Sequence, residues 1–143
     1  ERGRMAQKLG ALWMGNPLRQ DIARSVSEKE PLLLDAVFEC CGQQDAMDTA
    51  MDLLKPGGKL MVVGIPEFDR WSFPADVARR KEISIIHIRR QNHCAEETLD
   101  LLAAGTIDGS AMITHRFRFD EVAEAFDLVA HYRDGVMKAM VDF

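Results

Sequence analysis

Short apolar and β-branched runs alternate along the chain with stretches in which apolar residues recur at helical spacing. The short runs predict strands, and several lack the polar alternation of a half-exposed strand, as expected for strands buried on both faces. The predicted strands cover residues 12–14, 34–40, 59–65, 83–88, 112–118 and 136–141.

Two of the intervening stretches carry a single apolar stripe and predict amphipathic helices. The first stripe comprises Ala46, Met47, Ala50, Leu53 and Leu54, and the second comprises Val122, Ala125, Phe126, Val129 and Ala130. Asp120 is placed to act as the N-cap of the second helix, because its carboxylate can accept from free N–H groups. The sequence Lys55-Pro56-Gly57-Gly58 predicts a turn.

The repeating order of strand and helix favours an α/β fold with a parallel sheet, helices on both faces and right-handed crossovers. Ligands of such sheets bind outside the carboxyl ends of the strands. The residues to inspect are therefore those at the ends of the predicted strands, in segments 39–42, 63–65 and 88–92. One of them, Glu39, could serve a ligand or could equally cap nearby backbone amides.

The composition narrows the class of protein. The 143 residues suit one domain, and 47% hydrophobic with 29% charged residues is typical of a soluble globular protein. The net charge of −5 argues against nucleic acid or an anionic membrane surface as a partner. The three cysteines show no CxxC spacing, so we expect no disulfide framework, no thiolate zinc site, and a reducing, cytoplasmic compartment.

The strand ends and the segments between them occur in an order that resembles a known family. The order begins with Glu1-Arg2 and continues with Asp35-Ala36-Val37-Phe38-Glu39-Cys40-Cys41-Gly42. The segment 54–64 with its Pro-Gly-Gly turn and Ile88-Arg89 come next. The order ends with the segment 113–117, Glu124-Ala125-Phe126, Gly135 and Lys138. Over essentially the whole chain it is similar to the zinc-dependent medium-chain alcohol, polyol and threonine dehydrogenases, and most similar to the sorbitol dehydrogenase branch.

The resemblance implies a Rossmann-type doubly wound parallel sheet that is incomplete, since the family's first two strands and Gly-rich turn have no counterpart in this sequence. Residues 1–143 would form a partial NAD(P)-binding Rossmann domain without the family's zinc-binding catalytic domain. The intact enzyme would transfer hydride between a secondary alcohol, expected to be a polyol, and NAD. The acidic residue that selects NAD is also missing, which leaves NADP open.

The same resemblance implies that zinc belongs to the intact enzyme and is not bound by this segment. The segment would then hold no catalytic residue and would be inactive alone. Family members are usually dimers or tetramers, so we expect a homo-oligomer.

The resemblance also assigns roles to residues at the strand ends. The residues expected to contact the cofactor are Arg2, Cys41, Gly42, Val63, Gly64, Ile65, His87, Ile88, Arg89 and Lys138. Arg89 and Arg90 are expected to contact the substrate. Arg90 replaces a tyrosine of the sorbitol dehydrogenase branch, which favours a substrate that carries phosphate or carboxylate. Plainer interpretations stand beside these: Gly64 lets the chain turn, the arginines lie on the surface, and Lys138 faces solvent.

Two other functions stay open. S-adenosylmethionine-dependent methyltransferases often carry a similar Leu-Lys-Pro-Gly-Gly turn before a strand, although they usually end in an antiparallel hairpin. The chain could also be a non-catalytic NAD-binding regulatory module.

We predict that the isolated chain does not fold by itself, because the strand over residues 34–40 would expose an unpaired edge of backbone groups. Thermal unfolding of purified Glu1–Phe143 in dilute solution checks this expectation. A cooperative transition of a monomer would contradict it.

Overall fold

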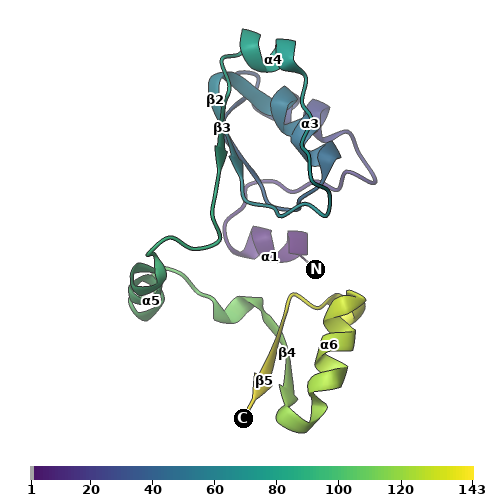
Figure 1. The fold of residues 1–143 in the computed structure, drawn as a ribbon, viewed down its shortest axis with the longest axis vertical. Helices are drawn as coiled ribbons and strands as arrows, with labels where there is room; N and C mark the ends of the chain where they lie inside the picture. Colours follow the sequence, from purple (N-terminus) through teal and green to yellow (C-terminus); the bar gives the residue numbers. More distant parts are fainter. Residues whose placement is uncertain (1) are drawn as a thin grey trace. The chain divides into compact units, whose positions relative to one another are not determined.

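A computed structural model describes residues 2–143 and divides them into two compact units. One unit is Asn16–Asn92, and the other joins the chain up to Gly15 with His93–Phe143. Glu1, the first residue of the family resemblance, lies outside the described residues. Figure 1 labels most of the helices and strands.

The elements follow the predicted alternation of strand and helix. The helices are α1 (Arg2–Lys8), α2 (Ile22–Lys29), α3 (Gln44–Leu53), α4 (Ala75–Arg80), α5 (Ala95–Ala103) and α6 (Val122–Ala130). The strands are β1 (Leu34–Glu39), β2 (Leu54–Val62), β3 (Ser84–His87), β4 (Ile113–Arg118) and β5 (Lys138–Asp142). Short 3₁₀ turns cover Ser110–Met112, Phe119–Glu121 and Arg133–Gly135.

The unit Asn16–Asn92 is built on a three-stranded sheet in the order β1-β2-β3, with both pairs parallel. The carboxyl ends of the strands are level, because Glu39 pairs with Val62 and Val62 pairs with His87. This confirms the parallel α/β architecture predicted from the alternation of elements.

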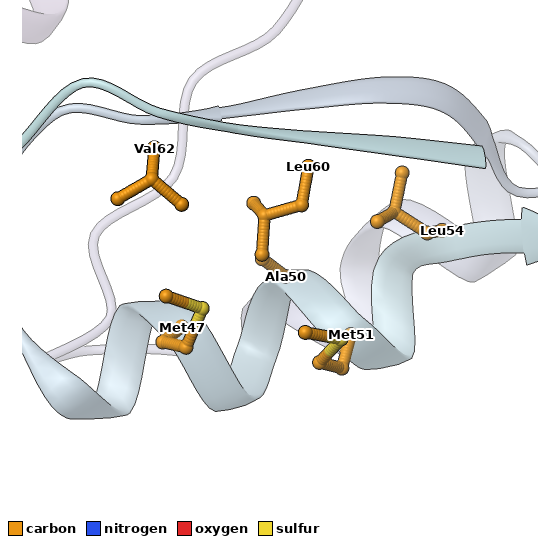
Figure 2. Close-up of a cluster of buried hydrophobic side chains, with 6 residues drawn as sticks. All are labelled: Met47, Ala50, Met51, Leu54, Leu60 and Val62. Carbon is orange, nitrogen blue, oxygen red and sulfur yellow. The ribbon is translucent and has the colours of Figure 1, made fainter. Parts of the chain in front are cut away.

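The core of this unit lies between β2 and α3. Figure 2 shows Leu60 and Val62 of β2 facing the apolar stripe of α3. The buried members of the cluster are Met47, Ala50, Met51, Leu54, Leu60 and Val62. Met47, Ala50, Leu53 and Leu54 of the predicted stripe are buried, whereas Ala46 is half-buried and the fully buried Met51 was not predicted. Burial of this cluster is the main apolar contribution to the stability of the unit.

A turn and a lysine fix the junction between α3 and β2. Segment 55–58 loops out of the β1–β2 ladder, as the register shift shows, and Gly57 has a φ of +76° that favours glycine. Lys81 Nζ donates to the carbonyl oxygens of Met51 and Asp52, both at 3.0 Å, and so places a cation at the carboxyl end of α3. The predicted Pro-Gly-Gly turn is confirmed.

The other unit contains a separate two-stranded parallel sheet of β4 and β5, connected by α6. The strands predicted over residues 112–118 and 136–141 thus pair with each other. The second apolar stripe is less buried than predicted: Ala125 is enclosed, whereas Phe126 is 73% exposed. Two strands offer too little surface to cover a whole helix face within this unit.

Two local predictions are corrected. Residues 12–14 form no strand, because the backbone groups of a strand need a neighbouring strand and residues 12–14 pair with none. Leu12 is fully exposed. Asp120 lies within a 3₁₀ turn, where its carboxylate accepts from the Arg118 guanidinium at 3.1 Å, and Glu121 is the N-cap residue of α6.

We predict that Leu60→Ala lowers the free energy of unfolding of the full-length protein by about 2–5 kcal/mol, because it opens a cavity in a fully buried position. Urea unfolding monitored by circular dichroism measures the change. Leu32→Ala is the matched control, since Leu32 is 86% exposed. Equal losses in the two variants would contradict the assignment of the core.

Candidate functional site

The carboxyl ends of three parallel strands form one edge of the sheet in the unit Asn16–Asn92. β1, β2 and β3 end at Glu39, Val62 and His87, which are paired in register across the sheet. The residues that follow these strands therefore lie along the same edge. The structure brings together Cys41, Gly42, Val63, Gly64, Ile65, His87, Ile88, Arg89 and Arg90.

The turns after β1 and β2 are in backbone contact through two glycines. Gly42 has a φ of +71°, and a Cβ on it would lie 2.5 Å from the carbonyl oxygen of Ile65. A Cβ on Gly64 would overlap the backbone nitrogen of Gly42 and Oε2 of Glu39. Both positions thus require glycine, because one turn approaches the other so closely. Atoms of Gly42 and Glu39 occupy the space that a side chain at position 64 would need.

Glu39 joins the two turns. Its Oε1 accepts from the backbone N–H of Cys41 at 2.8 Å, from that of Gly42 at 2.7 Å and from the Cys41 thiol at 3.0 Å. Its backbone oxygen accepts from the N–H groups of Val63 and Gly64 at 2.8 and 2.9 Å. The interpretation of Glu39 as a cap for nearby amides is confirmed.

Glu39 is only 3% exposed, yet its surroundings favour the ionised carboxylate. Burial raises the pKa of Glu39, but the hydrogen bonds from Cys41 and Gly42 outweigh burial and hold the pKa below its usual value. Burial, with the hydrogen bond to Glu39, raises the pKa of the Cys41 thiol. The raised pKa agrees with the role of the Cys41 thiol as a hydrogen-bond donor to the carboxylate.

The outer side of this edge is open and partly apolar. Val63, Ile65 and Ile88 are 40%, 69% and 41% exposed, and the side chains of Arg89 and Arg90 are exposed as well. The backbone N–H of Ile88 donates to the Val62 carbonyl at 2.9 Å, which carries the ladder one residue beyond β3. Exposed aliphatic groups beside two guanidinium groups can contact a ligand that is partly apolar and partly anionic.

Arg2 and Lys138, the two other predicted cofactor contacts, belong to the second unit. The Arg2 guanidinium carbon lies 5.2 Å from the centre of the Tyr132 ring, a cation–π distance. Lys138 is exposed at the start of β5. Contacts of these two residues with a cofactor remain predictions.

A surface hollow of about 470 Å³ was not predicted from the sequence. It is lined by Gln44, Phe68, Asp69 and Arg70. Gln44 holds the loop after β2, because its side chain donates to the Ser72 carbonyl at 2.7 Å and accepts from the Ser72 N–H at 3.1 Å. No local motif signals such a contact, since the two residues are 28 positions apart in the chain.

Among residues 2–143, no group of three or more His, Cys, Asp or Glu side chains is placed to hold a metal ion. No helix within those residues is long and apolar enough to cross a membrane.

Residues 1–104 match the sequence profile of a family described as zinc-binding dehydrogenase. The chain belongs to this family of zinc-binding dehydrogenases. It is 32% identical over 116 residues to L-idonate 5-dehydrogenase of Vitis vinifera, a match that covers 78% of this chain and 31% of the relative. It is 30% identical to sorbitol dehydrogenase 1 of Saccharomyces cerevisiae, over 75% of this chain and 30% of that enzyme.

The fold is that of the solved Rossmann-type dehydrogenases. An alcohol dehydrogenase of Escherichia coli CFT073, solved in complex with NADH, superimposes with a TM-score of 0.89 at 22% identity, covering 99% of this chain and 42% of the other. The chain thus spans well under half the length of these zinc-binding dehydrogenases and their solved neighbours. The family decides against the methyltransferase alternative.

We predict that Gly64→Ala destabilises the full-length protein by about 1–3 kcal/mol, because the new methyl group forces the two turns apart. Gly109→Ala serves as the control, since a Cβ there would meet only the end of the Leu102 side chain at 3.3 Å. Urea unfolding of both variants tests the prediction. Unchanged stability of Gly64→Ala would show that the turns are not in contact.

Proposed function

We propose that the protein carrying this chain is a zinc-dependent oxidoreductase that transfers hydride between a secondary alcohol, most simply a polyol, and NAD(P). The sheet edge formed by the ends of β1, β2 and β3 holds the nucleotide. The observation that carries this proposal is the level arrangement of three parallel strand ends, with Glu39, Val62 and His87 in register, in a chain of the zinc-binding dehydrogenase family. Ligands of open parallel sheets bind at such an edge.

Each part of the edge has a proposed role. The turn at Cys41 and Gly42 supports the adenine end of the cofactor, and Val63, Gly64 and Ile65 lie along the nicotinamide ribose. The segment His87–Arg89 lies beside the nicotinamide. The exposed aliphatic groups of Val63, Ile65 and Ile88 support these roles, because they offer apolar surface to a flat ring and a sugar.

Arg89 and Arg90 are proposed to bind the substrate. A guanidinium group offers five N–H donors, which suit a row of hydroxyl groups, a carboxylate or a phosphate. Two adjacent arginines at the open end of β3 favour an alcohol that also carries a negative charge. Arg2 and Lys138 are proposed as further cofactor contacts.

Zinc, when bound by the intact enzyme, would polarise the alcohol oxygen and lower its pKa. We assign zinc to no residue of this chain. The contribution of this chain is to orient the cofactor toward the substrate, so we propose that it has no dehydrogenase activity by itself. A cytoplasmic homo-oligomer, either a dimer or a tetramer, is the proposed assembly.

We predict that the full-length protein binds NADH or NADPH with a rise in nicotinamide fluorescence and oxidises polyols or their acidic derivatives. Arg89→Gln should raise the KM for the alcohol about tenfold or more, because it removes charge-assisted hydrogen bonds. Arg19→Gln is the matched control, since Arg19 lies exposed outside the edge. Fluorescence titration and steady-state kinetics measure both quantities.

Three outcomes separate the candidate functions. Binding of NADH with turnover of an alcohol supports the proposal. Binding of NADH without turnover of any polyol, aldonate or simple alcohol would point to a non-catalytic NAD-binding module. Failure of the full-length protein to bind either dinucleotide would refute the proposal.

A further inference from the structure

The two carboxylate oxygens of the buried Glu39 differ in their hydrogen bonds. Oε1 receives three donors, from the Cys41 N–H, the Gly42 N–H and the Cys41 thiol. Oε2 is buried and has no hydrogen-bond partner. Among residues 2–143 it is the one buried side-chain nitrogen or oxygen that lacks such a partner. An unpaired buried oxygen is costly, so its position calls for a physical reason.

Oε2 lies against the backbone of the turn after β2. A Cβ on Gly64 would overlap this oxygen, so the glycine leaves room for it. The only groups that Gly64 can turn toward Oε2 are Cα hydrogens, which are weak donors. The carboxylate therefore fills the space between the two turns. Oε1 accepts hydrogen bonds from the turn after β1, and Oε2 is in close contact with the turn after β2.

Glu39 also fixes the direction of four backbone N–H groups. Its side chain accepts from Cys41 and Gly42, and its carbonyl oxygen accepts from Val63 and Gly64. All four N–H groups thus point at one buried residue. These four N–H groups are therefore not available to a ligand at the open edge, and the course of the two turns depends on Glu39.

We propose that Glu39 is a positioning residue of the cofactor site, which sets the spacing of the turns at Gly42 and Gly64. The inference rests on the proposed function, because it concerns the same edge. It adds a residue that does not touch the cofactor and acts through the two turns that do. No other side chain of the described chain bonds both the N–H of Cys41 and that of Gly42.

The test uses the full-length protein with Glu39→Gln, Glu39→Ala and the control Asp35→Ala. Asp35 is a carboxylate at the other end of β1, 84% exposed and paired with Lys55, so its removal has little effect on folding. NADH affinity is measured by fluorescence titration and folding by thermal unfolding. Selective ¹⁵N-glycine labelling reports the amide protons of Gly42 and Gly64.

Glu39→Gln keeps an acceptor for the two amides but presses an NH₂ group on Gly64, so we expect NADH to bind several-fold more weakly while the protein stays folded. Glu39→Ala removes both contacts, and we expect a loss of about tenfold or more, as for hydrogen bonds to a charged group. The amide proton of Gly42 should move upfield in both variants, and the Gly64 signal should also move. Asp35→Ala should match the wild type in every measurement.

The outcomes decide the inference separately from the proposed function. Wild-type protein that binds neither NADH nor NADPH refutes the proposed function. Wild-type protein that binds one of the two dinucleotides, together with a folded Glu39→Gln variant that binds it equally well, overturns the present inference. If Glu39→Ala does not fold, the glutamine variant alone decides. Loss of folding in both variants would also overturn it, because Glu39 would then support the whole fold and not the placement of the two turns.

Discussion

The contact between the turns at Gly42 and Gly64 is the constraint on which the candidate site depends. Parallel pairing places Glu39 beside Val62, so the chain leaves β1 and β2 at the same level and the two turns must pass each other closely. Side chains at either glycine would meet backbone atoms of the other turn. The sheet edge can therefore form only where both turns lack a Cβ and a third group fills the remaining space.

Glu39 is that third group, and its ionisation follows from its place in the fold. The carboxylate accepts from the N–H groups of the turn that precedes α3, and these hydrogen bonds stabilise its negative charge. Gln43, the N-cap residue of α3, makes no side-chain capping bond, while its backbone N–H helps to lower the pKa of Glu39. Near the start of α3, Met47 packs with the buried side chains of β2. One residue thus links the start of α3 to the ends of two strands.

The sequence was sufficient for the features that arise from local periodicity. The stripe of α3, the turn at Gly57 and the parallel order of the strands follow from spacing and from glycine, and the structure has all three. The exposure of Phe126 and the irregular course of residues 12–14 could not be predicted, because both depend on which surfaces lie opposite. The pairing of Gly42 with Gly64 is likewise a contact between distant residues, and a single sequence carries no signal for it.

The charges at the edge are distributed unevenly, and this bears on the proposed substrate. A buried negative charge at Glu39 lies between the ends of β1 and β2, whereas Arg89 and Arg90 follow β3. A buried charge is poorly screened, so an anionic group is disfavoured near Gly42 and Gly64 and favoured near the arginines. The four N–H groups bound by Glu39 strengthen the same bias, because they cannot serve as anion donors. The physical asymmetry of the edge therefore supports uncharged parts of a ligand over β1 and β2 and a negatively charged alcohol beside β3.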